Sequence, residues 1–402
     1  MRRLPQLALC VLLLTAPSLF AQEIRGHAGM EGTWFFDEAA YPGQEERNLS
    51  LSGQAELHWS WNDGVDSLTV TPFLRWDDND GQRSHADMRE FMWLHVAESW
   101  ESRIGIGKVF WGFIESHHLV DIVNQTDLVE SPDGEEKLGQ PMANITFGTD
   151  HGVFDLFLLP FHRPRTYPGE SGRFRGAVPI SNDDAEYESS AGDKHVDLAA
   201  RWNHYLGEME FALSLFSGTS RDPSNFLATE PAVAPGSHPE ELQAFYPQIV
   251  QAGLEAEYLA GDLTWKLESI YREGGPEDYF ATVGGFEYTF YDMGSSGIDL
   301  GALLELHYDE RGKEASNIYQ NDVFLGGRLE LNDADASRLL MGVLLDNDYG
   351  SQYWTLEASR RLGGAYRILL DMQLVANVDA DDTRLYAVRQ DSFLRVELRR
   401  YF

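Results

Sequence analysis

The chain has 402 residues, a formal net charge of −34 and a mean hydropathy of −0.35. So acidic a chain is a poor partner for a phosphate backbone, and we expect no nucleic-acid binding. No segment contains the roughly eighteen consecutive apolar residues of a membrane helix. Transmembrane β-strands escape such a test because only alternate residues meet lipid, and an aromatic content of 12% suits their interfacial bands.

The N-terminus has the pattern of an export signal. Arg2 and Arg3 precede an apolar run over residues 7–14, and the small residue Ala21 stands at a plausible cleavage point. The run is too short to span a bilayer, so residues 1–21 are predicted to be a cleaved signal peptide. The only cysteine, Cys10, lies within it. The exported chain, residues 22–402, is therefore predicted to contain no disulfide.

From residue 24 onward, apolar and polar residues alternate in segments that read as β-strands. In residues 262–272, Leu263, Trp265 and Leu267 share one face, whereas Lys266 and Glu268 share the other. We predict about eighteen strands, an even number as closed barrels require, with sixteen as the nearest alternative. Their ranges are 24–36, 48–59, 67–76, 88–99, 103–110, 144–149, 153–159, 196–206, 208–217, 249–259, 262–272, 279–292, 298–309, 318–331, 337–346, 352–362, 366–377 and 393–402.

The connections between these strands alternate between tight turns and longer or more acidic loops. Tight turns are expected near Asn62, Glu101, His151, Gly207, Gly261, Gly294, Ala334 and Gly363. A transmembrane barrel places its tight turns on the periplasmic side and its longer loops outside, whereas a soluble β-sandwich has no reason to sort loops in this way. The pattern predicts an all-β fold, a single transmembrane antiparallel β-barrel.

One long loop, residues 111–141, holds many apolar residues among its polar ones. A fully solvated loop would not need that much apolar surface, so we expect it to pack inside the barrel wall and narrow a pore; an external cap is the alternative. The candidate constriction residues are Glu115, His117, His118, Asp121, Asn124 and Asp127. Trp111-Gly112 followed by Asp121, Asn124 and Asp127 resembles a segment found in several poorly characterised porin-like outer-membrane families.

The same loop contains the residue types of a hydrolytic triad in Ser116, the two histidines and Asp121. Adjacency in sequence does not produce triad geometry, and no Gly-x-Ser-x-Gly frame surrounds the serine. Neighbouring histidines seldom converge on one metal ion without spaced partners. We therefore expect no enzymatic activity, no metal and no cofactor.

The predicted lumen face carries charges of both signs, and its arginines gather on the last strands. They are Arg328, Arg361, Arg367, Arg395 and Arg399. One interpretation is a basic wall along which solutes slide. The other is that cross-strand ion pairs fill and stiffen the interior. The ion preference of the lumen is not readable from these residues.

The final segment, residues 393–402, alternates with Leu394, Val396 and Leu398 on one face, and Arg400 interrupts that face near the end. An amphipathic strand ending on an aromatic residue resembles the closing strand of a bacterial outer-membrane β-barrel. In that family the terminal Phe is part of the signal read by the assembly machinery, so the resemblance assigns Tyr401 and Phe402 to that signal.

Over its exported length the chain resembles a Gram-negative outer-membrane porin-like barrel. The resemblance implies a location in the cell outer membrane, contact with its lipid and lipopolysaccharide, and assembly by the barrel machinery. It implies passive diffusion of small hydrophilic solutes or ions through the lumen, and a homotrimer as in many porins. The alternative is a non-conducting barrel, either an adhesion or assembly component or a hydrolase with its site on the external rim.

Overall fold

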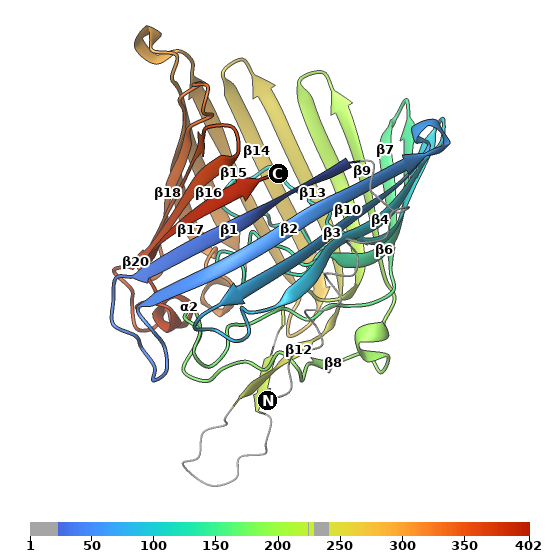
Figure 1. Ribbon diagram of the computed structural model, residues 1–402. Helices are drawn as coiled ribbons and strands as arrows, with labels where there is room; N and C mark the ends of the chain where they lie inside the picture. The colour runs from blue at the N-terminus through green and yellow to red at the C-terminus, as the bar shows by residue number, and fades with distance from the viewer. Residues whose placement is uncertain (1–22, 224, 229–240) are drawn as a thin grey trace, which may run out of the picture.

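The computed structural model describes residues 23–223, 225–228 and 241–402, so the predicted signal peptide, residues 1–21, lies outside the described residues. Eighteen antiparallel strands form one closed barrel (Figure 1), because β1 pairs with β2 on one side and with β21 on the other. The predicted fold class and strand number are confirmed. Around the wall the strands are β1 (Glu23–Phe35), β2 (Arg47–Trp61), β3 (Asp66–Asp77), β4 (Ala86–Val96), β5 (Trp100–Gly107), β6 (Gln140–Thr149), β7 (Gly152–Leu159), β9 (Asp197–Leu206), β10 (Met209–Thr219), β13 (Gln248–Ala260), β14 (Leu263–Gly274), β15 (Tyr279–Phe290), β16 (Asp299–Asp309), β17 (Asn321–Glu330), β18 (Arg338–Asp346), β19 (Gln352–Leu362), β20 (Tyr366–Ala376) and β21 (Phe393–Tyr401).

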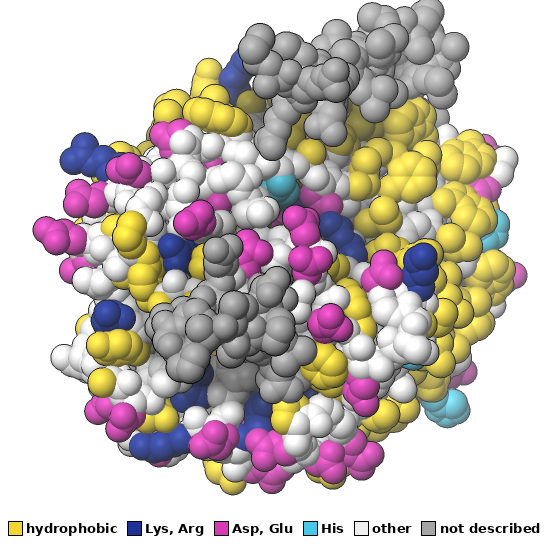
Figure 2. Space-filling model, turned by 90° about the horizontal axis from the view of Figure 1, so that it is seen from below, with side chains coloured by type: hydrophobic (Ala, Val, Ile, Leu, Met, Phe, Trp, Pro, Cys, Tyr) yellow, Lys and Arg dark blue, Asp and Glu magenta, His cyan; other side chains and the backbone are white. Residues whose placement is uncertain are grey.

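Short connections lie at one end of the barrel, at the top of Figure 1, and the long loops lie at the other. We call these the tight-turn end and the long-loop end. Two connections at the long-loop end, residues 275–278 and 347–351, are nevertheless short. Seen from that end, acidic side chains are scattered over the loops, whereas hydrophobic ones gather on the flank of the wall (Figure 2).

The long loops contain secondary structure that the strand pattern did not predict. A three-stranded sheet is formed by β8 (Glu186–Tyr187), β11 (Asn225–Ala228) and β12 (Leu242–Tyr246), and a short helix, α2, spans Thr383–Ala387. The remaining helical turns are 3-10 turns at Asn62–Gly64, Gly192–Lys194, Met293–Ser295 and Gly312–Glu314. Among the described residues, no helix is long and apolar enough to cross a membrane.

The outer face of the wall is apolar. Strand residues such as Leu215, Trp265 and Leu325 expose about half of their surface outward, and the intervening residues point into the lumen. Large aromatic side chains gather near both ends of the strands, the arrangement of interfacial girdles. Those toward the tight turns include Trp61, Trp100, Tyr205, Phe290 and Tyr366, and those toward the long loops include Trp34, Trp76, Tyr271, Phe280 and Tyr308.

The segment between β5 and β6, residues 108–139, packs against inward-facing side chains of the wall. Val120, Ile122 and Val123 of this segment are fully or almost fully buried. The apolar cluster that they join is made of Met92, Trp111, Val120, Ile122, Val123, Met142, Phe157, Leu159, Ala199, Phe216, Ile249, Ile270, Tyr279 and Ala281. Its wall members come from β4, β6, β7, β9, β10, β13, β14 and β15, so this arc of the lumen is filled by a hydrophobic core.

Candidate functional site

Three wall glutamates hold the N-terminal half of the segment. The backbone N–H groups of Phe113, Ile114 and Val120 donate to the carboxylate of Glu268, at 2.7, 2.9 and 3.2 Å. A hydrogen bond to a charged group contributes about 1.5–3 kcal/mol. One carboxylate on β14 therefore fixes a stretch of eight residues, 113–120.

Two further glutamates extend the same anchorage to β13 and β16. Glu255 accepts from the Gly112 N–H at 3.1 Å, and Glu305 accepts from the N–H groups of Glu115 and Ser116 at 2.9 and 3.0 Å. Gly112 has a φ of +126°, and a Cβ there would lie 2.7 Å from a Glu268 carboxylate oxygen. Only glycine lets the backbone approach the glutamates this closely.

The C-terminal half of the segment is held by arginines of β3 and β4. Arg75 donates to both carboxylate oxygens of Glu130 at 2.8 and 2.9 Å, and Arg89 donates to Asp127 at 2.7 Å. Arg89 stands in a β-bulge, since the β3–β4 register slips between Thr71 and Pro72. The bulge directs its guanidinium toward the segment.

Among the described residues, two cavities of several hundred cubic ångströms lie inside the barrel. The inner one, about 550 Å³, lies between the segment and β17–β21, and the outer one, about 430 Å³, is lined by the segment and by long-loop residues. The residues that line both cavities are Ser116, His118, Asp133, Glu135, Tyr319 and Tyr353. We call these residues the neck, because they stand between the two cavities.

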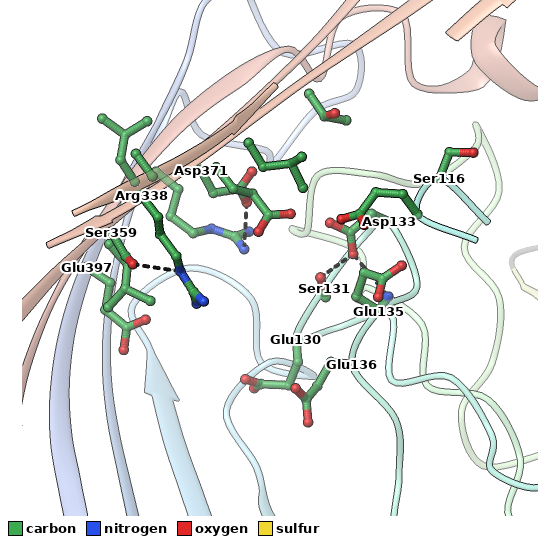
Figure 3. A pocket seen from close by; sticks show the side chains of 18 of the residues that line it. Ser116, Glu130, Ser131, Asp133, Glu135, Glu136, Arg338, Ser359, Asp371 and Glu397 are labelled. Carbon is green, nitrogen blue, oxygen red and sulfur yellow. Dashed lines mark hydrogen bonds and ion pairs between the residues drawn. The ribbon is translucent and has the colours of Figure 1, made fainter. Parts of the chain in front are cut away.

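The segment crosses the lumen at the neck. Asp133 accepts a hydrogen bond from the Gln373 amide of β20 at 3.0 Å, and the Tyr353 hydroxyl of β19 donates to the same Gln373 at 2.6 Å. The segment thus reaches from the glutamates of β13–β16 to the opposite wall. In Figure 3, Asp133 and Glu135 lie across the inner cavity from Asp371 and Arg338 of the wall.

The two histidines of the segment differ in charge. His117 stacks on Tyr319, with ring centroids 4.2 Å apart, and burial together with the charge of His118 lowers the pKa of His117 to about 4. Burial also disfavours the charged form of His118. The hydrogen bond that His118 donates to Glu135 at 3.3 Å and the negative charges of Glu135, Glu268 and Asp121 outweigh it and raise the pKa of His118. The segment therefore contains one neutral imidazole, His117, and one readily charged imidazole, His118 of the neck.

The predicted constriction residues occupy three different environments. Glu115 lines the inner cavity and pairs with Arg328 at 2.5 Å; His118 lines both cavities; His117 and Asp121 line the outer one. Burial raises the pKa of Asp121, whose nearest cation is Lys137 at 3.5 Å.

Asn124 and Asp127 anchor the segment from buried positions. Asn124 borders the outer cavity but is 1% exposed, and its amide donates to the carbonyls of Gly107 and Leu138. Asp127 lines neither cavity and is bound to Arg89 and Thr166.

Of the six neck residues, only His118 is a predicted constriction residue, and sequence reasoning missed Asp133, Glu135, Tyr319 and Tyr353 altogether. Asp133 and Glu135 belong to the acidic stretch at residues 130–136, which follows the last predicted constriction residue directly. Tyr319 and Tyr353 come from distant parts of the chain. The signal for the first pair was Asp133-Gly134, a turn dipeptide whose glycine has a φ of +86° and which reverses the chain inside the lumen.

The predicted basic-wall arginines separate into two groups. Arg328, Arg395 and Arg399 line the inner cavity and each contacts a carboxylate, Arg395 pairing with Glu31 at 3.5 Å. Arg361 and Arg367 do not line this cavity. They lie beyond it, on the inward face at the tight-turn end.

Ser116 contacts neither neighbouring histidine in a triad-like manner. Its Oγ lies 2.8 Å from Nε2 of His307 on β16 and 2.5 Å from the Glu305 carboxylate. Because the hydroxyl proton is donated to Glu305, the contact fixes the segment to the wall. The described residues contain no group of His, Cys, Asp or Glu placed to hold a metal ion.

The chain end lies on the barrel seam. The Phe402 N–H and carbonyl pair with Gly26 at 3.1 Å each, and the Tyr401 N–H donates to the Ala365 carbonyl at 2.7 Å. The Phe402 side chain is 64% exposed. Its backbone therefore belongs to the wall, while its ring is open to contact from outside.

No family model and no curated protein sequence matches the chain. Among solved structures it is similar to Wzi of Escherichia coli, whose structure is described as a carbohydrate-binding β-barrel, an outer-membrane protein involved in group 1 capsule assembly. The identity is 11% and the TM-score 0.51, over 98% of this chain and 87% of Wzi. Mutants of the Rh. blastica porin match at 11% identity and a TM-score of 0.45, over 94% of this chain and 99% of theirs. At this identity the likeness to Wzi establishes the fold alone, that of a closed antiparallel β-barrel.

Proposed function

We propose that the protein is a channel of the Gram-negative outer membrane for passive diffusion of small hydrophilic solutes or ions. One observation carries the proposal. The inner cavity, in the arc of the lumen that the hydrophobic core leaves open, and the outer cavity lie on either side of the neck, to which residues 108–139 contribute four of the six side chains. A barrel with a purely structural lumen has no need to leave this arc open while a hydrophobic core fills the other.

The test is single-channel conductance of the purified barrel in a planar bilayer, with a salt gradient that gives ion selectivity. We expect stable open steps. Gln373→Ala removes the wall partner of Asp133 and Tyr353, so its conductance should exceed that of the unmodified protein. Gln251→Ala is the matched control, because Gln251 is also buried and inward-facing but binds Arg272 and lines neither cavity.

A silent barrel with intact β-structure, in both the unmodified protein and Gln373→Ala, would overturn the channel proposal. The Asp133–Gln373 contact specifically favours the second candidate, a non-conducting barrel, because it ties the segment across the lumen. In that case the outer cavity becomes a binding pocket. Wzi, described as carbohydrate-binding, then makes soluble oligosaccharides the first ligands to test.

A further inference from the structure

Three inward-facing arginines form one cross-strand row at the tight-turn end. Arg361 of β19 lies directly opposite Arg367 of β20, which in turn lies directly opposite Arg399 of β21. Each alternates with an outward apolar neighbour, Leu362, Ile368 and Leu398 respectively. The row therefore faces the lumen near its tight-turn end, where Arg399 lines the inner cavity and Arg361 and Arg367 lie beyond it.

Arg328 and Arg395, deeper in the barrel, are each paired with carboxylates, whereas this row is paired only in part. Arg328 contacts Glu115 and Glu287, and Arg395 contacts Glu31 and Asp371. Within the described parts of the chain, the only carboxylate that pairs with a member of the row is Glu397, which binds Arg399 at 2.7 and 2.8 Å.

Like charges directly opposite on neighbouring strands destabilise a sheet. Glu397 offsets one guanidinium of the row and leaves Arg361 and Arg367 side by side without a counter-ion among the described residues. A wall that only had to be filled would not need this arrangement. Guanidinium groups present paired N–H donors that match the oxygens of a carboxylate or phosphate.

We propose that this arginine row binds the oxyanion groups of small solutes, carboxylate or phosphate, at the tight-turn mouth. The site faces the lumen rather than the apolar outer surface, so its ligand is a dissolved anion and not a lipid headgroup. The tight-turn mouth thereby favours multivalent anionic solutes. The neck differs in charge, because the acidic side chains of Asp133 and Glu135 line it. The preference for anionic solutes rests on the proposed channel function, whereas the binding of anions by the row does not require conduction.

The probe is citrate, a small tricarboxylate, titrated calorimetrically into the full barrel in a neutral detergent that supplies no anionic lipid. We expect saturable binding that weakens with salt, because exposed charges are screened. The double variant Arg361→Gln with Arg367→Gln should weaken it about tenfold or more, since two charged donors are lost. Inorganic phosphate, titrated in parallel, separates a general oxyanion site from one that prefers carboxylates.

Arg360→Gln is the matched control. Arg360 adjoins Arg361 in sequence, but its guanidinium pairs with Asp335 at 2.6 Å and Asp333 at 3.3 Å. The control loses one guanidinium next to the row, where the double variant loses two, and should bind citrate as the unmodified protein does. A second double variant with lysine at 361 and 367 keeps the charge, removes the planar fork and should bind with intermediate affinity. If the glutamine variant fails to fold, the lysine variant still tests whether the row binds citrate.

In the planar bilayer, citrate on the side of the membrane that the tight turns face should interrupt the current. Citrate on the side that the long loops face should not. Equal binding by the unmodified protein and the folded variants of the row would overturn the inference, whatever the conductance. A silent barrel that binds citrate only with the row intact would overturn the channel function and support the anion site.

Discussion

At the residue scale, the neck depends on a contact between one histidine and one glutamate. Burial opposes the negative charge of Glu135, but the hydrogen bond from His118 and the charges of His118 and Lys137 outweigh it and lower the pKa of Glu135. The pKa of His118 is raised by the same contact. The charged pair therefore stabilises the neck in full between the ordinary Glu pKa of 4.5 and the ordinary His pKa of 6.5. This stabilisation is lost as the pH falls through the lowered pKa of Glu135 or rises through the raised pKa of His118.

This titration predicts a pH-dependent ion preference. As His118 loses its proton, the neck keeps the carboxylate of Glu135 and becomes more negative, so cation selectivity should increase as the pH rises above neutrality. His117, with a pKa of about 4, stays neutral throughout. The measurement is the reversal potential in a salt gradient between about pH 5 and pH 9.

The variant His118→Gln keeps a polar side chain without the titration, and its reversal potential should no longer show the step. His151→Gln is the control, since His151 lies in an exposed turn at the far end of the barrel. An unchanged step in His118→Gln would assign the pH dependence to another group, such as Asp133, whose pKa is raised by burial and by the charge of Glu135.

At the scale of elements, the segment over residues 108–139 is held as an internal partner of the wall, with Glu268 as its main anchor. Glu268→Ala leaves three buried N–H groups without an acceptor, at a cost of about 1–3 kcal/mol for each. We expect the segment to loosen while the barrel stays closed. Conductance should rise and become noisier, and the segment should become sensitive to protease in the folded protein.

Glu210→Ala controls for the loss of an inward carboxylate, because Glu210 binds Asn203 and lines neither cavity. Glu268→Gln retains one acceptor oxygen and should have a smaller effect than the alanine variant. If Glu268→Ala leaves both conductance and protease resistance unchanged, the segment is held by its apolar core and not by the glutamates.

The strands could be predicted from the sequence, whereas most of the neck could not. Each strand repeats the same local pattern, since every second residue faces lipid and must be apolar. Glu268, by contrast, looks like any other lumen-facing acid, and its role depends on backbone groups about 150 positions away. The available signal was a break in the pattern: Phe157, Phe216 and Ile270 are apolar on the inward face of their strands and are buried by the segment.

At the scale of the whole molecule, barrel closure brings the chain end to the seam with β1. Phe402 is fixed by its backbone pairing with Gly26, while its ring stays exposed. We propose that the ring serves recognition by the assembly machinery more than stability. Phe402→Ala should therefore reduce the amount assembled in the outer membrane several-fold, yet leave refolding in detergent almost unchanged. The measurements are the amount of heat-modifiable barrel in isolated membranes and the yield of refolding from urea.

The exposed ring of Phe290, at the end of β15, offers the control, because Phe290→Ala removes a similar aromatic surface away from the seam. Equal losses of assembly in the two variants would mean that aromatic surface, rather than the terminal position, is what assembly requires. A parallel loss of refolding yield in Phe402→Ala would make the residue a structural part of the seam.

The segment separates two tasks along its length. Residues 111–124 carry the buried core and the glutamate contacts, whereas the turn at residues 131–136 supplies the two acidic side chains of the neck, Asp133 and Glu135. Mutations in the turn can therefore alter its charge and width without exposing the core. Under the proposed function, substitutions at a few turn residues could adapt such a barrel to new solutes, while the folding of the wall stays the same.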